Sequence, residues 1–156
     1  YLYLGGWVKD DVYVQRETGE KIFKGDSLEI LLDSKVSFDF YLDVLSLDDY
    51  QIGISPGLTT IGSSPEAYLW YPSSRSKTLT NVKISALATA DGYQFEVAIP
   101  WSIFKIDPSG ADHYGFGISI SDNDHPTRNS QQSMVSNLPG RVLTRPMTWG
   151  DLKLVK

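Results

Sequence analysis

The chain has 156 residues, 12% of them aromatic, and its 14 Lys and Arg against 19 Asp and Glu give a net charge of −5. This length suits a single folded domain, 1–156, and the aromatic content excludes a disordered chain. The acidic balance argues against nucleic-acid binding, and no apolar run approaches the roughly 20 residues of a membrane-inserted helix. There is no Cys, which excludes disulfides and thiol catalysis.

Short alternating runs, separated by turns rich in Gly, Pro, Asn and Asp, predict β-strands throughout the chain. We expect them at 1–4, 27–33, 50–54, 67–71, 82–89, 93–99, 114–121, 132–136 and 148–155. Asp91-Gly92 separates two of these runs and predicts a hairpin. Because no helical period is sustained, the sequence predicts an all-β antiparallel sandwich, jelly-roll or immunoglobulin-like. The chain opens directly in a strand, so we expect N-terminal strands of the domain to be missing from it.

The sequence carries no signature of an enzyme. It has no Gly-rich phosphate loop, no Gly-x-Ser-x-Gly turn, and only His113 and His125 to serve a nucleophile. Paired carboxylates at 10–11, 29/33 and 48–49 would suit a glycosidase if two of them shared one cleft. They fit solvated turns and strand ends better, and we predict a non-catalytic protein.

Asp122-Asn123-Asp124 places three oxygen-bearing side chains at the end of a predicted strand. Ca²⁺ takes six to eight oxygen ligands, so Asp122 and Asp124 are candidate ligands. The spacing is not that of an EF-hand, and such clusters also cap turns through their own backbone.

The tryptophans fall into different settings. Trp70 stands just before the turn Pro72-Ser73-Ser74, where an exposed ring would form a platform for a sugar, although it could equally fill the sandwich. Trp101 follows the hairpin and favours the core. Trp149 falls on the face opposite Leu152, which predicts an edge or surface position.

Six segments in a fixed order resemble the carbohydrate-binding module family 9 domain: YLYLGGWVKDD, GDSLEILLD, DYQIGIS, DGYQFEVAIPWSIF, GFGISISDND and WGDLKLVK. They extend from Tyr1 to Lys156. The resemblance implies a calcium-containing antiparallel β-sandwich, usually an appended module of secreted bacterial polysaccharide-degrading or surface proteins.

Sugar binders of this family hold the end of a glycan chain between two aromatic rings, while Glu and Arg contact its hydroxyls. Carried over by position, Glu29 matches the family Glu, and the first aromatic falls at or near Phe23. The second falls near Leu143, where no aromatic stands. Glu29 also has a structural interpretation, in which it pairs with an Arg or Lys at a sheet edge.

The arginines depart from the family pattern. An Arg expected inside DYQIGIS is Gly53 here, and the candidates for a second family Arg are Arg128 and Arg141. The resemblance implies calcium as a structural clip for loops. Its first candidate ligands are Asp122 and Asp124, followed by Asp10 and Asp11.

The resemblance therefore implies a non-catalytic carbohydrate-recognition module, extracellular or at a bacterial cell surface. Its expected partners are a polysaccharide or oligosaccharide and other domains of a longer parent chain. One alternative is a structural, adhesion or assembly sandwich that binds no sugar. Another is a haem-binding electron-transfer domain, for which Met134 and Met147 are the available Met ligands.

Overall fold

The computed structural model describes residues 1–39, 41–110 and 113–155. Its strands are β1 (Leu2–Lys9), β2 (Ser27–Asp33), β3 (Asp49–Ser55), β4 (Glu66–Tyr71), β5 (Lys77–Thr78), β6 (Lys83–Thr89), β7 (Gly92–Ile99), β8 (His113–Asp122), β9 (Ser133–Ser136) and β10 (Gly150–Lys153). Its helical elements are α1 (Val36–Asp39) and the 3-10 turns η1 (Gly19–Lys24), η2 (Ser73–Arg75), η3 (Trp101–Ile103) and η4 (Pro146–Thr148). Within the described ranges, none of these helices is long and apolar enough to cross a membrane.

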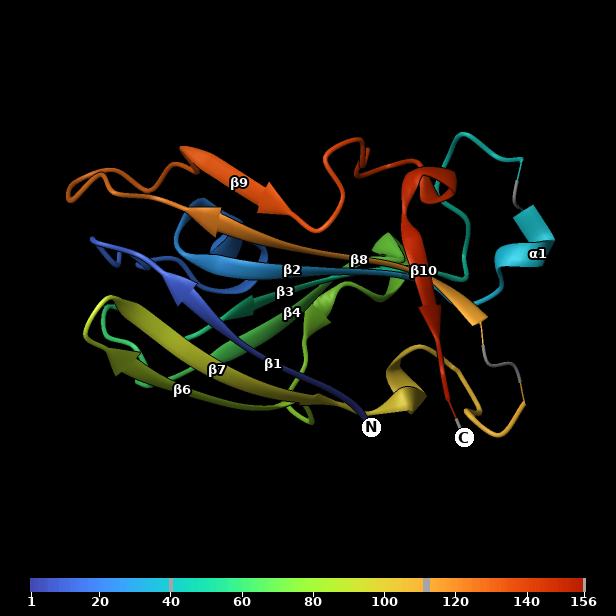
Figure 1. The fold of residues 1–156 in the computed structure, drawn as a ribbon, viewed down its shortest axis with the longest axis horizontal. Coiled ribbons are helices and arrows are strands. Elements are labelled where there is room, and N and C mark those ends of the chain that lie inside the picture. Colours follow the sequence, from blue (N-terminus) through green and yellow to red (C-terminus); the bar gives the residue numbers. More distant parts are fainter. Residues whose placement is uncertain (40, 111–112, 156) are drawn as a thin grey trace.

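The strands form two antiparallel sheets that pack face to face (Figure 1). The smaller sheet has the order β1-β7-β6. The larger sheet has the order β10-β8-β2-β3-β4-β5. β9 pairs with residues 119–122 at the C-terminal end of β8. This arrangement confirms the predicted antiparallel β-sandwich.

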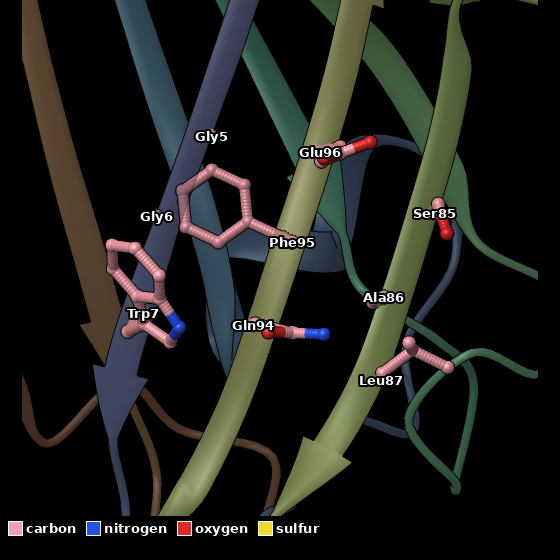
Figure 2. Close-up of a pocket in the computed structure, with 9 residues that line it drawn as sticks. All are labelled: Gly5, Gly6, Trp7, Ser85, Ala86, Leu87, Gln94, Phe95 and Glu96. Carbon is pink, nitrogen blue, oxygen red and sulfur yellow. The ribbon is translucent and has the colours of Figure 1, made fainter.

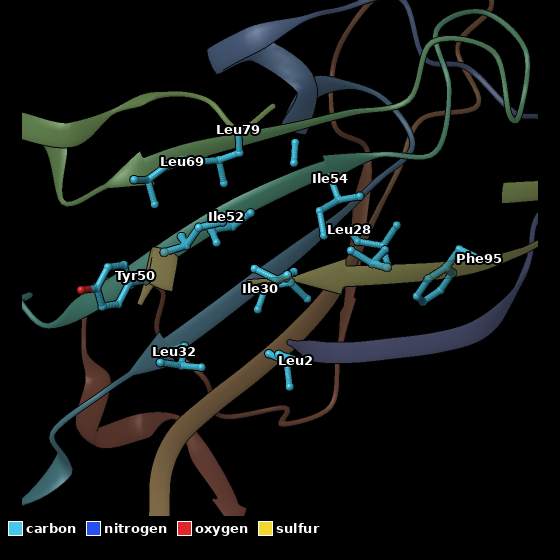
Figure 3. Close-up of a cluster of buried hydrophobic side chains, with 14 of the residues drawn as sticks. Leu2, Leu28, Ile30, Leu32, Tyr50, Ile52, Ile54, Leu69, Leu79 and Phe95 are labelled. Carbon is cyan, nitrogen blue, oxygen red and sulfur yellow. The ribbon is translucent and has the colours of Figure 1, made fainter. Parts of the chain in front are cut away.

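The core lies between the two sheets and follows the period-two pattern of the strands. Leu28, Ile30 and Leu32 of β2 point into it and meet Phe95 and other side chains of the smaller sheet (Figure 3). Alternate residues of β2 face the other way, so Glu29 lies on the outer face of the larger sheet. These outward residues are nevertheless buried, because η1 and the segment 137–147 lie over that face.

Two local predictions need correction. The pairing of Thr89 with Gly92 places the hairpin turn at Ala90-Asp91, one residue earlier than expected, and Gly92 adopts a φ of 142° at the first paired position. Trp149 is only 7% exposed, and its indole Nε1 donates to the carbonyl of Val142 at 3.1 Å. It is buried because the segment that covers the larger sheet folds back over it.

Candidate functional site

A groove of about 590 Å³ opens on the outer face of the larger sheet. Residues from η1, β2, β3 and β4 form its floor and one wall, and the segments around β9 and 143 form the other. They are Glu20, Lys21, Phe23, Lys24, Glu29, Gln51, Trp70, Gln131, Met134 and Leu143. The groove therefore combines two aromatic rings with several polar side chains.

Phe23 and Trp70 make the aromatic wall of this groove. Their rings meet edge to face, with centroids 6.1 Å apart and planes at 74°. The indole Nε1 of Trp70 donates to the carbonyl of Glu20 at 2.8 Å, which ties the ring to η1. Phe23 is 41% exposed, so part of its ring is free to contact a ligand.

Trp70 occupies the space above Gly53 in the neighbouring strand. The register of β3 and β4 shifts between Gln51 and Ile52, and this bulge leaves Trp70 without a directly paired residue. A Cβ atom at Gly53 would overlap the Trp70 ring and come within 2.8 Å of Ile22 Cδ1. No larger side chain fits there, and an indole stands where the family resemblance implied an arginine.

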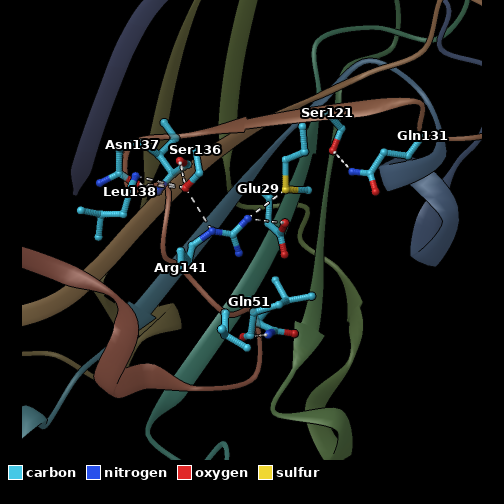
Figure 4. Close-up of polar contacts among 12 residues, drawn as sticks. Glu29, Gln51, Ser121, Gln131, Ser136, Asn137, Leu138 and Arg141 are labelled. Carbon is cyan, nitrogen blue, oxygen red and sulfur yellow. Dashed lines mark hydrogen bonds and ion pairs between the residues drawn. The ribbon is translucent and has the colours of Figure 1, made fainter.

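Glu29 and Arg141 form an ion pair (Figure 4), and Glu29 lines the same groove as the aromatic wall. Arg141 Nη2 and Glu29 Oε2 are 3.9 Å apart, and the two side chains are only 6% and 8% exposed. Arg141 also donates to Ser136 Oγ at 3.1 Å and to Met134 Sδ at 2.9 Å. Among the described residues, none donates a hydrogen bond to the Glu29 carboxylate, which leaves its oxygens available to a ligand.

Burial is the dominant influence on the charge of Glu29. It raises the pKa of the Glu29 carboxyl above its usual value, because the charged form loses solvation, and the Arg141 guanidinium only partly opposes the shift. A buried carboxylate without hydrogen-bond donors is stabilised by a ligand that donates hydrogen bonds to it.

Two glutamines of the groove were missed by the sequence interpretation. Gln51 Nε2 donates to the carbonyl of Leu143 at 2.8 Å, and this bond holds the covering segment to the sheet. Gln131 Nε2 donates to Ser121 Oγ at 2.6 Å. The period-two pattern could have identified Gln51, because Gln51 lies on the same outer face as Gly53.

The structure brings together most of the residues that were predicted to contact sugar. Phe23, Glu29 and Trp70 line the groove, and Arg141 lies directly behind Glu29. Arg128 does not line the groove; it lies in the exposed segment that precedes Gln131. The groove has Leu143 where the resemblance implied a second aromatic.

A group of acidic side chains lies outside the groove, where the chain leaves β1 and where β8 ends. Asp10, Asp122 and Asp124 each offer a carboxylate oxygen, and these oxygens lie within 4.8 Å of one another. Asp10 Oδ2 is buried and accepts no hydrogen bond from the described residues. Asp11 is outside this trio, but its charge contributes to raising the pKa values of Asp10 and Asp124.

Asp26 is a fourth acidic residue at this end, and the sequence interpretation missed it. It borders the same 430 Å³ cavity as Asp10, Asp122 and Asp124. Burial raises the pKa of Asp26 to about 7, with Asp10 and Asp122 adding to the effect, and the N–H groups of Val14 and Asn123 oppose it. The three converging carboxylates of Asp10, Asp122 and Asp124, one of which has an orphaned buried oxygen, fit a hard divalent cation such as Ca²⁺.

The fold is an antiparallel β-sandwich with a groove on the outer face of its larger sheet, and comparisons with known proteins identify the family. The model of the carbohydrate family 9 binding domain-like family matches residues 1–156, so the chain belongs to that family. No curated protein matches the chain.

Two similar solved structures are family 9 carbohydrate-binding modules from Caldicellulosiruptor kristjanssonii. One is a complex with cellotriose, with a TM-score of 0.69 and 18% identity over 97% of this chain and 67% of that chain. The other is a complex with glucose, with a TM-score of 0.67 and 18% identity over 98% of this chain and 70% of that chain. At this identity, the similarity establishes the fold.

Proposed function

We propose that the chain is a non-catalytic module that binds oligosaccharide in the groove between Phe23, Trp70 and Glu29. The observation that carries this proposal is the placement of the aromatic wall beside the buried pair of Glu29 and Arg141. The C–H face of a pyranose ring packs on an aromatic ring, while the ring's hydroxyls donate to a carboxylate. Cellotriose and glucose, the ligands of the two similar structures, are the first sugars to test.

The groove can hold a sugar without performing chemistry on it. Glu29 is the one carboxylate of the described groove that lies deep beside the aromatic wall, and Glu20 lies exposed at its rim. We infer that the Glu29 carboxylate accepts hydrogen bonds from the sugar hydroxyls. Arg141 holds the Glu29 side chain in place through the ion pair. The Arg141 contact with Met134 Sδ also weighs against the haem alternative, because it occupies the Met sulfur nearest this groove.

The proposed setting is a larger exported or cell-surface protein of a bacterium, in which this module holds neighbouring domains close to a polysaccharide. A shallow groove with one complete aromatic wall gives modest affinity, and attachment to further binding modules would raise the overall avidity.

We propose that Ca²⁺ binds at Asp10, Asp122 and Asp124, with Asp26 beside them, and acts structurally. The orphaned Asp10 Oδ2 supports this assignment. A divalent cation would neutralise the repulsion among the carboxylates and so hold the chain after β1 to the end of β8.

Isothermal titration calorimetry with cellotriose and glucose tests the sugar proposal. Glu29→Gln removes a charged hydrogen-bond acceptor and should weaken binding by about tenfold or more, since such bonds contribute about 1.5–3 kcal/mol. Phe23→Ala should weaken it by a smaller factor. Phe38→Ala removes an aromatic ring that is 81% exposed and distant from the groove, and serves as the matched control.

Two outcomes contradict the proposal. Sugar binding that both groove variants leave unchanged would place the site elsewhere on the molecule. If neither these sugars nor a wider glycan array shows saturable binding, the alternative of a structural or assembly module would take the place of sugar recognition.

A further inference from the structure

The outer face of the smaller sheet carries a strip of exposed aromatic side chains that the groove does not use. Tyr3 and Trp7 of β1 point away from the core and are 74% and 82% exposed. Gly5 lies between them on the same face. Tyr3 and Trp7 are four positions apart, so their Cα atoms are separated by about 13 Å along the strand. Gly5 carries no side chain between them, and Figure 2 shows it beside Trp7.

Polar side chains of the neighbouring strands form the floor beside this gap. Gly5 pairs across the sheet with Glu96 of β7, which pairs in turn with Ser85 of β6. Two hollows of about 450 and 420 Å³ lie on either side of this row, and both are lined by Gly5, Glu96 and Ser85. Together they form one trough that runs along the strands from Tyr3 to Trp7, which we call the sheet trough.

Three polar side chains of the sheet trough have no partner in the described part of the chain, while Lys83 lies over the Tyr1 ring with its Nζ 5.6 Å from the ring centroid. Among the described residues, none hydrogen-bonds or forms an ion pair with the side chains of Ser85, Gln94 or Glu96. Gln94 lies opposite Trp7 in the register of β1 and β7, so an amide stands directly beside the exposed indole. The trough therefore offers donors and acceptors next to aromatic rings.

The glycine in the middle of the sheet trough is not required by packing. A Cβ atom at Gly5 would meet only the carbonyl oxygen of Phe95, at 3.7 Å, which is an ordinary contact. Glycine in a strand costs stability, because it loses more conformational entropy and packs no side chain. Its presence here keeps the trough open.

We propose that the sheet trough is a second glycan site, which binds the interior of an extended, β-1,4-linked pyranose chain. Such a chain is a flat ribbon that presents C–H faces to Tyr3 and Trp7 and hydroxyls to Glu96, Gln94 and Ser85. An uncharged polyhydroxylated ligand matches a surface that has unpaired polar groups and little net charge. The groove and the sheet trough lie on opposite outer faces of the sandwich, so one polysaccharide network could be bound at two points.

Affinity electrophoresis in gels that contain hydroxyethyl cellulose, glucomannan or xylan tests this site, because long polymers present few chain ends. We expect at least one polymer to retard the chain. Trp7→Ala and Gly5→Val should each weaken that retardation by about tenfold. Phe38→Ala should leave it within about twofold, while Trp7→Ala leaves cellotriose titration in the groove unchanged.

Gly5→Val is the sharpest variant, because valine favours a strand and should not destabilise the fold. The proposal is overturned if none of the three polymers retards the chain, or if Glu29→Gln abolishes retardation and Trp7→Ala does not. It is also overturned if sedimentation shows a dimer that Trp7→Ala dissociates without any polymer binding. If polymers retard the protein but no small sugar binds in the groove, the result supports the sheet trough and contradicts only the groove proposal.

Discussion

Trp70 lies over Gly53 so closely that glycine is the only residue the site accepts. The bulge between β3 and β4 places the Trp70 indole in this position, and the hydrogen bond from Trp70 Nε1 to the carbonyl of Glu20 holds the ring there. The exchange of a cationic side chain for an aromatic wall gives this groove a more apolar character than the resemblance implied. In the function proposed above, this wall would pack against the C–H face of a sugar ring.

Gly53→Ala should destabilise the fold, because the added methyl group must displace the Trp70 ring or Ile22. We expect a loss of about 1–3 kcal/mol in the free energy of unfolding, the usual cost of overpacking. Urea denaturation measures this loss. Gly140→Ala is the matched control, because no atom lies within 4 Å of a Cβ at that position. Equal stability of the two variants would show that Trp70 does not occupy this space.

Leu143→Trp should strengthen sugar binding by about fivefold, because a second aromatic would face Phe23 and Trp70 across the groove. An aromatic contact contributes about 1 kcal/mol. Leu143 is partly exposed and lines the groove, so a larger side chain has room to extend into it. Cellotriose titration of the variant and the wild type measures the gain. Weaker binding would mean that the new indole fills the groove instead of enclosing the sugar.

Glu29 should make the stability of the fold depend on pH. Its folded-state pKa is raised above 4.5, so the folded protein retains the proton to a higher pH than the unfolded chain does. The stability of the wild type relative to Glu29→Gln should therefore be greatest below the unfolded pKa and fall as pH rises through the folded pKa.

Urea denaturation of the wild type and Glu29→Gln, from below the unfolded pKa of Glu29 to above its folded pKa, measures the difference in their free energies of unfolding. The contributions of other titratable groups cancel because they are common to the two proteins. A difference that grows with rising pH would mean that attraction to Arg141 outweighs burial.

Calcium should raise the melting temperature, and EDTA should reverse the rise. Binding at 100 times Kd contributes about 2.7 kcal/mol, which corresponds to several degrees for a domain of this size. Asp124→Asn should lose most of this gain. In EDTA the same variant should be as stable as the wild type or more so, because it relieves repulsion with Asp122 and Asp11.

Asp107→Asn is the control for the calcium experiment, since Asp107 is exposed and its side chain accepts hydrogen bonds only from Ser109 among the described residues. A calcium-dependent rise that Asp124→Asn leaves intact would move the ion away from this cluster.

The strands and their order could be predicted because each strand's alternation is local. Ser27 to Asp33 is a short, largely apolar run with turn residues on both sides, and this identifies the strand. It does not identify which face meets the core, because all seven residues are buried. Trp149 shows the limit of the method. Alternation placed it on the face away from the core correctly, but the same face is covered by the segment 137–147, and only the folded chain reveals that cover.

The sequence by itself determined the sandwich, the family resemblance and the chemical candidates Phe23, Glu29 and Asp122, because these depend on local pattern and motif order. Only the tertiary structure decided which candidates meet. It placed Arg141 rather than Arg128 behind Glu29, added Asp26 to the acidic cluster and exposed Trp7 beside Gln94. The physical reason is that contacts between distant segments depend on strand register and on the path of the covering loops, which residue periodicity does not encode.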